Sequence, residues 1–327
     1  MLKIGVLGAG HLGKIHIKLW KEIEGVQLVG FYDPDFDTSF KVQQEFEITS
    51  YDSIDNLIAA CDAVDIVSPT SYHHSLALKA IQKRRHVFIE KPLANTVREA
   101  EDIVKHAHES GIKAQVGHVE RFNPAFLAVK NIDFQPLFIE THRLAIFNPR
   151  GTDVSVVYDL MIHDIDLLLS IVKANVKRVQ ANGVAVVSKS PDIANARIEF
   201  DNGCVANITA SRISMKNMRK MRLFQKDAYI SMDFLAKQSE IIRLSDDGDM
   251  NEAGVSKIDL AGGESKFIKV AMLQGEEVNA IKMELEMFRD AILFDKEIPV
   301  PVDEGYRAMK LAQTIQDKIN KNLMAAV

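Results

Sequence analysis

Short apolar runs recur along the first part of the chain and predict strands buried on both faces, at residues 2–7, 26–32, 63–68, 86–90 and 113–117. Between them the apolar positions follow the helical period, which predicts helices over residues 11–24, 74–83 and 96–110. Strands that alternate with helices form parallel sheets with helices on both faces. We therefore predict a doubly wound α/β domain over residues 1–118.

The pattern changes after Gly117, where apolar and polar residues alternate with the period of half-exposed strands. Strands are predicted at residues 137–144, 178–187, 194–200, 205–211, 219–224, 228–233 and 240–244. The turn Asp201-Asn202-Gly203 predicts a hairpin between two of them. Helices are predicted over residues 121–130, 157–172, 278–294 and 303–320, and a surface excursion over residues 245–265.

Residues 119–327 are accordingly predicted to be a second α/β domain with a large, open, mainly antiparallel sheet. One face of this sheet is expected to pack on helices. A partner subunit is the expected cover for the other face, which predicts a homodimer or a homotetramer.

Composition and charge narrow the class of protein. The chain is 47% hydrophobic with a net charge of −5, which gives no reason to expect nucleic acid or an anionic membrane as a partner. Cys61 and Cys204 have no metal-binding spacing and are expected to be buried free thiols. The first predicted strand begins at residue 2, and no apolar run approaches 18 residues. We expect no signal peptide, no membrane span and a cytoplasmic location.

Three glycines lie between the first predicted strand and the following helix, in the pattern Gly8-x-Gly10-x-x-Gly13. In this setting the first glycine permits a tight turn, the second lets the backbone approach a pyrophosphate, and the third lets the helix pack close to the strand. The predicted helix begins at His11, and His11 and Leu12 lie in its first turn. There the free backbone N–H groups and the helix dipole favour the binding of phosphate. The pattern predicts a Rossmann domain that binds a dinucleotide.

Asp33 ends the second predicted strand, twenty residues after Gly13. A carboxylate at this position accepts hydrogen bonds from both hydroxyls of the adenosine ribose and repels a 2′-phosphate. The next residues, Pro34 and Asp35, supply no arginine for such a phosphate. We therefore expect NAD(H) rather than NADP(H) as the cofactor.

Cofactors of doubly wound sheets bind outside the carboxyl ends of the strands. Further cofactor-binding residues are therefore expected where other strands end, at Ser68, Pro69, Thr70, Glu90 and Lys91. The pair His73-His74 opens the next helix. His73 is a candidate cofactor contact, although ordinary contacts at a helix N-terminus explain the pair equally well.

Lys91 is a candidate catalytic residue. Because Pro92 restricts the preceding residue to extended backbone, Lys91 has a narrow range of directions, and its strand end aims it toward the nicotinamide. The alternative is an ordinary solvated lysine.

Asp159 and His163 are the other candidate catalytic residues. Their spacing of four places both on one helix face, where a carboxylate can orient an imidazole and stabilise its charged form, as a general base requires. A buried histidine with structural hydrogen bonds, or an acid favoured by the helix dipole, is the alternative. Asp164 and Asp166 do not complete a metal-binding set with His163, and no metal is expected.

Arg121 and Arg143, with Arg150 and Asn123, are candidate substrate-binding residues of the second domain. Arginine binds phosphate through two parallel hydrogen bonds, but it also forms structural ion pairs, and the sequence leaves both open.

Several of these motifs occur together in one order: the glycine pattern, Pro69 with His73, Glu90-Lys91-Pro92, Arg121-Phe122-x-Pro124, Asp159-x-x-x-His163 with Asp166, and Ile298-Pro299-Val300-Pro301 before the last helix. In these motifs the chain resembles the Gfo/Idh/MocA family of oxidoreductases (glucose-fructose oxidoreductase and inositol dehydrogenase) over essentially its full length. The resemblance implies a Rossmann domain, an α/β domain whose open sheet forms dimers or tetramers, and hydride transfer between a nicotinamide cofactor and sugars, cyclitols or related compounds.

The resemblance also implies roles for single residues. Lys91 corresponds to the lysine that hydrogen-bonds the reacting hydroxyl, His163 to the general base, and Asp159 to the acid that assists it. The family often has a glycine pair before the catalytic helix, where this chain has Val154-Ser155-Val156-Val157.

Residues 117–124 and 158–166 look most like the branch that acts on nucleotide sugars, which includes UDP-N-acetylglucosamine 3-dehydrogenases that form a 3-keto sugar. The arginines would suit a diphosphate. Three alternatives stay open: a dehydrogenase of a free polyol such as inositol or of a hexose, a non-catalytic NAD-sensing protein, and a reductase of a non-sugar such as a tetrapyrrole or an imine.

Overall fold

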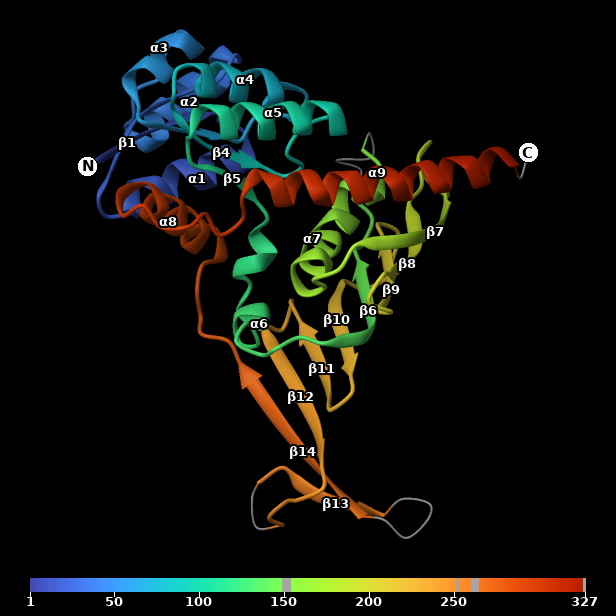
Figure 1. Cartoon of the computed structure of the whole chain (residues 1–327). Helices are drawn as coiled ribbons and strands as arrows, with labels where there is room; N and C mark the ends of the chain where they lie inside the picture. Colours follow the sequence, from blue (N-terminus) through green and yellow to red (C-terminus); the bar gives the residue numbers. More distant parts are fainter. Residues whose placement is uncertain (149–153, 251–252, 260–264, 326–327) are drawn as a thin grey trace. The chain divides into compact units, whose positions relative to one another are not determined.

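The computed structural model describes residues 1–148, 154–250, 253–259 and 265–325 of the chain (Figure 1). The chain divides into two compact units. Unit 1 consists of Met1–Val119 and Asn279–Lys310, and unit 2 consists of Glu120–Val278 and Leu311–Val327. Each unit is described by itself below.

Unit 1 contains a five-stranded sheet in the order β2-β1-β3-β4-β5, with every pair parallel. The strands are β1 (Leu2–Leu7), β2 (Val26–Tyr32), β3 (Ala63–Ile66), β4 (His86–Glu90) and β5 (Ala114–Gly117). The strand order reverses between β1 and β3, which is where doubly wound sheets bind their ligands. The predicted doubly wound sheet is confirmed.

The helices of this unit follow the order expected for crossover connections: α1 (His11–Glu22), α2 (Phe36–Phe46), α3 (Ile54–Ala60), α4 (Thr70–Gln82) and α5 (Val97–Ser110). Helices α4 and α5 lie side by side in Figure 1. Thr96 and Glu99 begin α5 with a capping box, and Gly111 ends it in the left-handed conformation. The prediction missed α2 and α3, of which α3 has only seven residues and α2 buries only Val42.

Helix α8 (Ala280–Leu293) also belongs to unit 1, although its residues were predicted to lie in the second domain. Its buried Leu285 and Phe288 share a core with Trp20 of α1 and Phe88 of β4, and the two phenylalanine ring centroids are 5.8 Å apart. The first break between the units follows Val119, beside the boundary predicted at residue 118. Residues 279–310 belong to unit 1 instead of the predicted second domain, because an apolar helix late in the chain returns to cover the first sheet.

Unit 2 contains a nine-stranded sheet in the order β13-β14-β12-β11-β10-β6-β9-β8-β7, which is antiparallel except for β6 and β9 (Figure 1). The strands are β6 (Pro136–Leu144), β7 (Val176–Val184), β8 (Ile193–Phe200), β9 (Val205–Ser211), β10 (Met218–Gln225), β11 (Ala228–Asp233), β12 (Gln238–Ser245), β13 (Val255–Asp259) and β14 (Ser265–Gln274). The open, mainly antiparallel sheet is confirmed, and Gly203 forms the predicted hairpin turn with φ of 89°. The excursion expected over residues 245–265 instead includes a strand, β13, which pairs with the unpredicted β14.

The short helices of unit 2 are η1 (Val119–Phe122), α6 (Pro124–Leu127), η2 (Val157–Met161) and α7 (Ile162–Ile171). Helix α9 (Val302–Ala325) begins in unit 1 and continues in unit 2 from Leu311. The helix predicted over residues 121–130 is broken, because Asn123 takes an extended conformation before Pro124 and caps α6 with its side chain. Segment η2 and helix α7 pack against β9 on one face of the sheet. Among the described residues, no helix is long and apolar enough to cross a bilayer.

Candidate active site

The glycine loop between β1 and α1 is shaped by contacts within the protein at two of its three glycines. Gly8 has φ of 105°, and a Cβ atom there would lie 2.8 Å from the backbone nitrogen of Ser68. A Cβ atom at Gly13 would lie 2.2 Å from the carbonyl oxygen of Gly8. At Gly10, no described atom lies within 4 Å of such a Cβ atom. Glycine at position 10 is therefore not required by the packing of the protein, and it leaves open space in front of the loop.

This open space faces the N-terminus of α1, where Gly10 is the N-cap residue. Within the described residues, no side chain caps this helix end, and its first turn carries no acid. The backbone N–H groups of the first turn and the positive end of the helix dipole suit an anionic ligand there. The loop thus fits the pyrophosphate of a dinucleotide.

Asp33 lies directly beside the glycine loop. Its Oδ2 atom accepts a hydrogen bond of 2.8 Å from the N–H of Ala9, and its Oδ1 atom accepts one of 2.9 Å from the N–H of Asp35. These two bonds fix the carboxylate while leaving each oxygen a further lone pair. The group can therefore accept the ribose hydroxyls expected of it.

His73 connects the loops that follow β3 and β4. Its buried ring lies between the carbonyl oxygens of Ser68, at 2.8 Å from Nε2, and of Pro92, at 2.9 Å from Nδ1. Burial lowers the pKa of His73 and outweighs the opposite effect of its hydrogen bonds to the two carbonyl oxygens. The neighbouring His74 instead pairs with Asp102 on α5, at 2.8 Å. His73 therefore holds together the loops carrying Pro69, Thr70 and the segment 90–92.

The segment Glu90-Lys91-Pro92 follows the carboxyl end of β4, with a cis peptide bond between Lys91 and Pro92. The Oε2 atom of Glu90 accepts a hydrogen bond of 3.1 Å from the backbone N–H of Lys91. A Cβ atom at Gly117, where β5 ends, would lie only 2.8 Å from Oε1 of Glu90. Glycine at position 117 therefore makes room for the Glu90 carboxylate.

In unit 2, Asp159 and His163 lie on consecutive but different helical segments. Asp159 belongs to the π-helical turn η2, and His163 is in the first turn of α7. The sequence predicted one continuous α-helix over residues 157–172, so the predicted α-helical spacing of the two residues does not apply. Single π-helical turns are frequent at functional sites, and this one runs directly into α7 at Ile162.

Contacts with the last part of α9 fix η2 in place. The hydroxyl of Tyr158 donates a hydrogen bond of 2.8 Å to Gln313, and the hydroxyl of Ser155 donates one to Gln316. Burial, together with the charge of Asp317, raises the pKa of Tyr158 to about 12, so its hydroxyl remains a donor.

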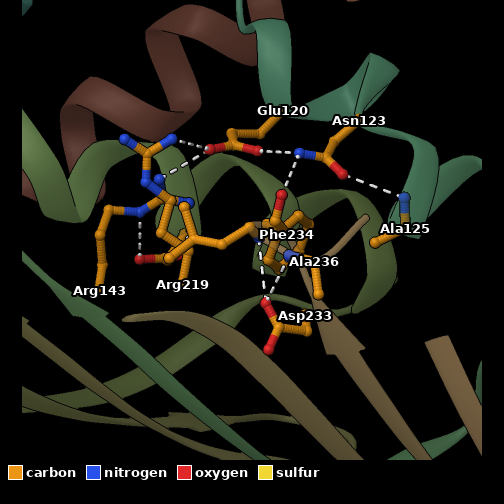
Figure 2. A network of polar contacts seen from close by, with 10 residues as sticks. Glu120, Asn123, Ala125, Arg143, Arg219, Asp233, Phe234 and Ala236 are labelled. Carbon is orange, nitrogen blue, oxygen red and sulfur yellow. Dashed lines mark hydrogen bonds and ion pairs between the residues drawn. The ribbon is translucent and has the colours of Figure 1, made fainter. Parts of the chain in front are cut away.

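Arg143 was a candidate substrate ligand, but its guanidinium is buried within unit 2. It donates to Asp164 through Nε at 2.9 Å and Nη2 at 3.0 Å, and to Glu120 through Nη1 at 2.8 Å. Figure 2 shows Glu120 between Arg143 and Asn123, with Arg219 beside it. The Asn123 amide donates to Glu120 and to the carbonyl of Phe234. Arg143 and Asn123 are therefore occupied by the protein itself.

Arg121 is similarly engaged. Its Nε and Nη2 atoms donate to the two carboxylate oxygens of Asp166 at 2.6 and 2.8 Å, and its side chain is only 12% exposed. The acids at 164 and 166 thus tie α7, which carries His163, to β6 and η1. Arg150, the remaining candidate, lies outside the described residues. Among those residues, no group of three or more His, Cys, Asp or Glu side chains is placed to hold a metal ion.

The sequence analysis did not identify the acids that pair with buried cations in the two units. Glu120 and Asp164 face Arg143 from 23 and 21 residues away, and no local pattern reveals this. In unit 1, Asp65 interrupts the apolar strand β3, and His16 follows Gly13 by one helical turn. An acid inside a buried strand is a signal that could have identified a buried cation nearby.

Comparison with known proteins decides the family. Residues 2–118 match the oxidoreductase family with an NAD-binding Rossmann fold, and residues 135–230 match the Gfo/Idh/MocA C-terminal domain. The chain is 40% identical over 235 residues to the UDP-N-acetylglucosamine 3-dehydrogenase of Acidithiobacillus ferrooxidans, an alignment that covers 72% of this chain and 74% of that protein. The chain belongs to the Gfo/Idh/MocA family. It is an NAD-binding oxidoreductase.

Two further comparisons agree with this assignment. A solved structure of the same Acidithiobacillus ferrooxidans enzyme superposes with a TM-score of 0.87 at 32% identity, covering 97% of each chain. The scyllo-inositol 2-dehydrogenase (NAD(+)) of Bacillus subtilis is 29% identical over 234 residues, covering 65% of this chain and 68% of that protein.

The two glycines with opposite surroundings give a matched pair of variants. Gly13→Ala is expected to lower the free energy of unfolding by about 1–3 kcal/mol, because its Cβ atom overlaps the backbone of Gly8. Gly10→Ala has room and a compatible φ of −65°, so stability should stay the same or rise by up to about 1 kcal/mol. The affinity of Gly10→Ala for NAD⁺ should nevertheless fall at least about tenfold. Chemical denaturation and titration calorimetry measure both quantities. Unchanged NAD⁺ affinity in Gly10→Ala would show that the pyrophosphate does not cross Gly10.

Proposed function

We propose that this oxidoreductase oxidises a hydroxyl of a nucleotide sugar, with the 3-hydroxyl of UDP-N-acetylglucosamine as the first candidate and a 3-keto sugar as the product. The observation that supports this substrate is the 40% identity with a UDP-N-acetylglucosamine 3-dehydrogenase over 72% of the chain. Oxidation of a free polyol is the second candidate, because an inositol dehydrogenase is also similar, at 29% identity.

The proposed reaction assigns one task to each candidate catalytic side chain. NAD⁺, when bound, accepts the hydride from the carbinol carbon. The Lys91 ammonium donates a hydrogen bond to the reacting hydroxyl oxygen and stabilises the negative charge that develops there, an effect worth about 3–4 kcal/mol per donor at such sites. His163 removes the hydroxyl proton, and Asp159 favours the resulting imidazolium.

The proposed cofactor-binding residues are those at the carboxyl edge of the first sheet: Gly8, Gly10, His11, Leu12, Gly13, Asp33, Ser68, Pro69, Thr70, His73, Glu90 and Lys91. Among the proposed substrate ligands, Arg150 is retained. We assign Arg121, Arg143 and Asn123 to positioning α7 and α6 instead, because their donors are used by Asp166, Asp164 and Glu120. An alanine substitution at Arg121 would therefore not report on diphosphate binding.

We also infer a homo-oligomer formed through the open face of the unit 2 sheet, and a reducing compartment, the cytoplasm. On that face, Phe138, Phe224 and Tyr229 form a half-exposed aromatic cluster with ring centroids 5.8 and 5.0 Å apart. Phe224 is 39% exposed, a large apolar area that a second copy of the chain would bury. The thiols of Cys61 and Cys204 are free, which fits a reducing compartment.

Light scattering tests the oligomer. The wild-type protein is expected to have two or four times the mass of one chain. Phe224→Arg should lower that mass, because it places a charge within the inferred interface between two copies of the chain. Phe294→Arg is the control, since this phenylalanine is 63% exposed but belongs to unit 1. A wild-type monomer, or equal effects of both variants, would contradict the inferred interface.

The substrate is tested by following NADH formation with NAD⁺ and a panel of compounds. UDP-N-acetylglucosamine should be oxidised, whereas free N-acetylglucosamine, free hexoses and inositol should react far more slowly. Activity confined to free polyols would support the second candidate instead. No NADH with any of the compounds, combined with tight NAD⁺ binding, would contradict both and favour an NAD-sensing protein.

The catalytic assignment is tested by Lys91→Ala and His163→Ala. Each should lower kcat by about 10²–10⁴-fold, because the lost groups act on the hydroxyl. NAD⁺ affinity should change little in His163→Ala, since His163 is not among the proposed cofactor-binding residues. Lys113→Ala is the matched lysine control: Lys113 precedes β5, at the opposite end of the sheet, and pairs with Asp295 at 2.7 Å. Near-normal turnover in either active-site variant would refute the corresponding role.

A further inference from the structure

His16 lies in unit 1, on α1, one helical turn after Gly13, and is completely buried. Its Nδ1 atom is 2.8 Å from Oδ2 of Asp65, which is itself buried within β3. Its Nε2 atom is 3.3 Å from Oε1 of Glu90, at the end of β4. One imidazole therefore contacts two carboxyl groups, on two neighbouring strands.

The contacts on both ring nitrogens determine the charge of His16. Nδ1 makes a hydrogen bond with Asp65, whereas Nε2 makes a longer ionic contact with Glu90. Two carboxylates beside one ring favour its charged form, the imidazolium. Burial by itself lowers the pKa of His16, but the charge of Asp65 and hydrogen bonds to Asp65 and Glu90 outweigh it and raise the pKa to about 10. A buried cation is thus balanced by acids from β3 and β4.

Two aromatic residues fix the orientation of this group. The indole Nε1 of Trp20, one turn further along α1, donates a hydrogen bond of 2.7 Å to the same Oδ2 atom of Asp65. The ring of Phe88 packs edge-on against His16, with centroids 5.9 Å apart. Asp65 is therefore held by two donors, and the His16 ring has little freedom to turn away from Glu90.

The effect of His16 continues through Glu90 to the catalytic candidate. While Oε1 of Glu90 faces His16, its Oε2 atom accepts the backbone N–H of Lys91 at 3.1 Å. The Glu90 side chain is only 12% exposed, and Gly117 leaves just enough room for it. Removing the cation would leave the Glu90 carboxylate without its charged partner, and a turn of this side chain toward water would weaken its bond to Lys91.

We propose that His16 is a positioning residue: held as an imidazolium between Asp65 and Glu90, it keeps the Glu90 carboxylate aimed at the Lys91 N–H, and so sets the direction of the Lys91 side chain. This inference rests on the proposed role of Lys91 in the reaction. His16 thereby connects α1, which begins at the glycine loop, with the segment that carries Lys91, and both belong to unit 1.

Nitrogen NMR of the histidine side chains tests the charge directly, without turnover. The His16 ring, assigned by comparison with a His16 variant, should show both nitrogens protonated in the apo protein at pH 8. A neutral ring at that pH would overturn the proposal.

Two isosteric variants separate positioning from stability. His16→Gln places its amide near the former Nε2 atom and can still donate to Glu90, whereas His16→Asn places its amide near Nδ1 and can donate only to Asp65. His16→Asn should lower kcat by about 10- to 100-fold with little change in NAD⁺ affinity. His16→Gln should recover part of that loss even if both variants are equally destabilised.

Trp20→Phe is the control within the same cluster. It removes the second hydrogen bond to Asp65 but leaves the imidazolium facing Glu90, so it should lower the melting temperature with a much smaller change in kcat. If kcat falls in step with melting temperature across all three variants, His16 is structural only and the proposal fails. Absence of turnover in the wild-type protein would refute the proposed reaction, whereas a normal wild-type reaction with a neutral His16 would refute this inference alone.

Discussion

Each unit of this protein contains a buried cation that faces two carboxylates, and the segments that carry the candidate catalytic residues depend on these contacts. In unit 1 the cation is His16, between Asp65 and Glu90. In unit 2 it is Arg143, between Asp164 and Glu120. A charge removed from water is tolerated only when paired, so these contacts leave few alternative positions for the chain around them.

Buried ion pairs of this kind contribute little net stability, because their attraction is largely offset by lost hydration, but removing one partner costs about 3–5 kcal/mol. Their value here is geometric. Asp164 and Asp166 lie on either side of Ile165 in α7 and pair with arginines from β6 and η1. Helix α7 therefore cannot rotate or slide without breaking a buried pair, and the position of His163 within unit 2 is fixed by residues other than itself.

The sequence predicted those parts of the site that depend on local geometry. The glycine pattern and the acid twenty residues after Gly13 are recognisable from their spacing alone. Gly8 and Gly13 lie as expected in the glycine loop, and Asp33 lies beside it. The partners of the arginines could not be predicted in this way. Whether Arg143 meets a substrate or a protein carboxylate depends on which acids of the chain fold against it, and Glu120 lies 23 residues away. The π-helical turn at Asp159 and the return of α8 to unit 1 are likewise products of tertiary packing that residue periodicity does not encode.

Trp20 has a spectroscopic consequence, because it is the single tryptophan of the chain. Its indole is buried and donates its hydrogen bond to Asp65, next to the His16 ring. Selectively excited tryptophan fluorescence of the whole protein therefore originates at one known position, in α1 beside Asp65. A shift of its emission maximum when NAD⁺ is added reports on the electrostatic surroundings of Asp65, without a label and without background from other indoles.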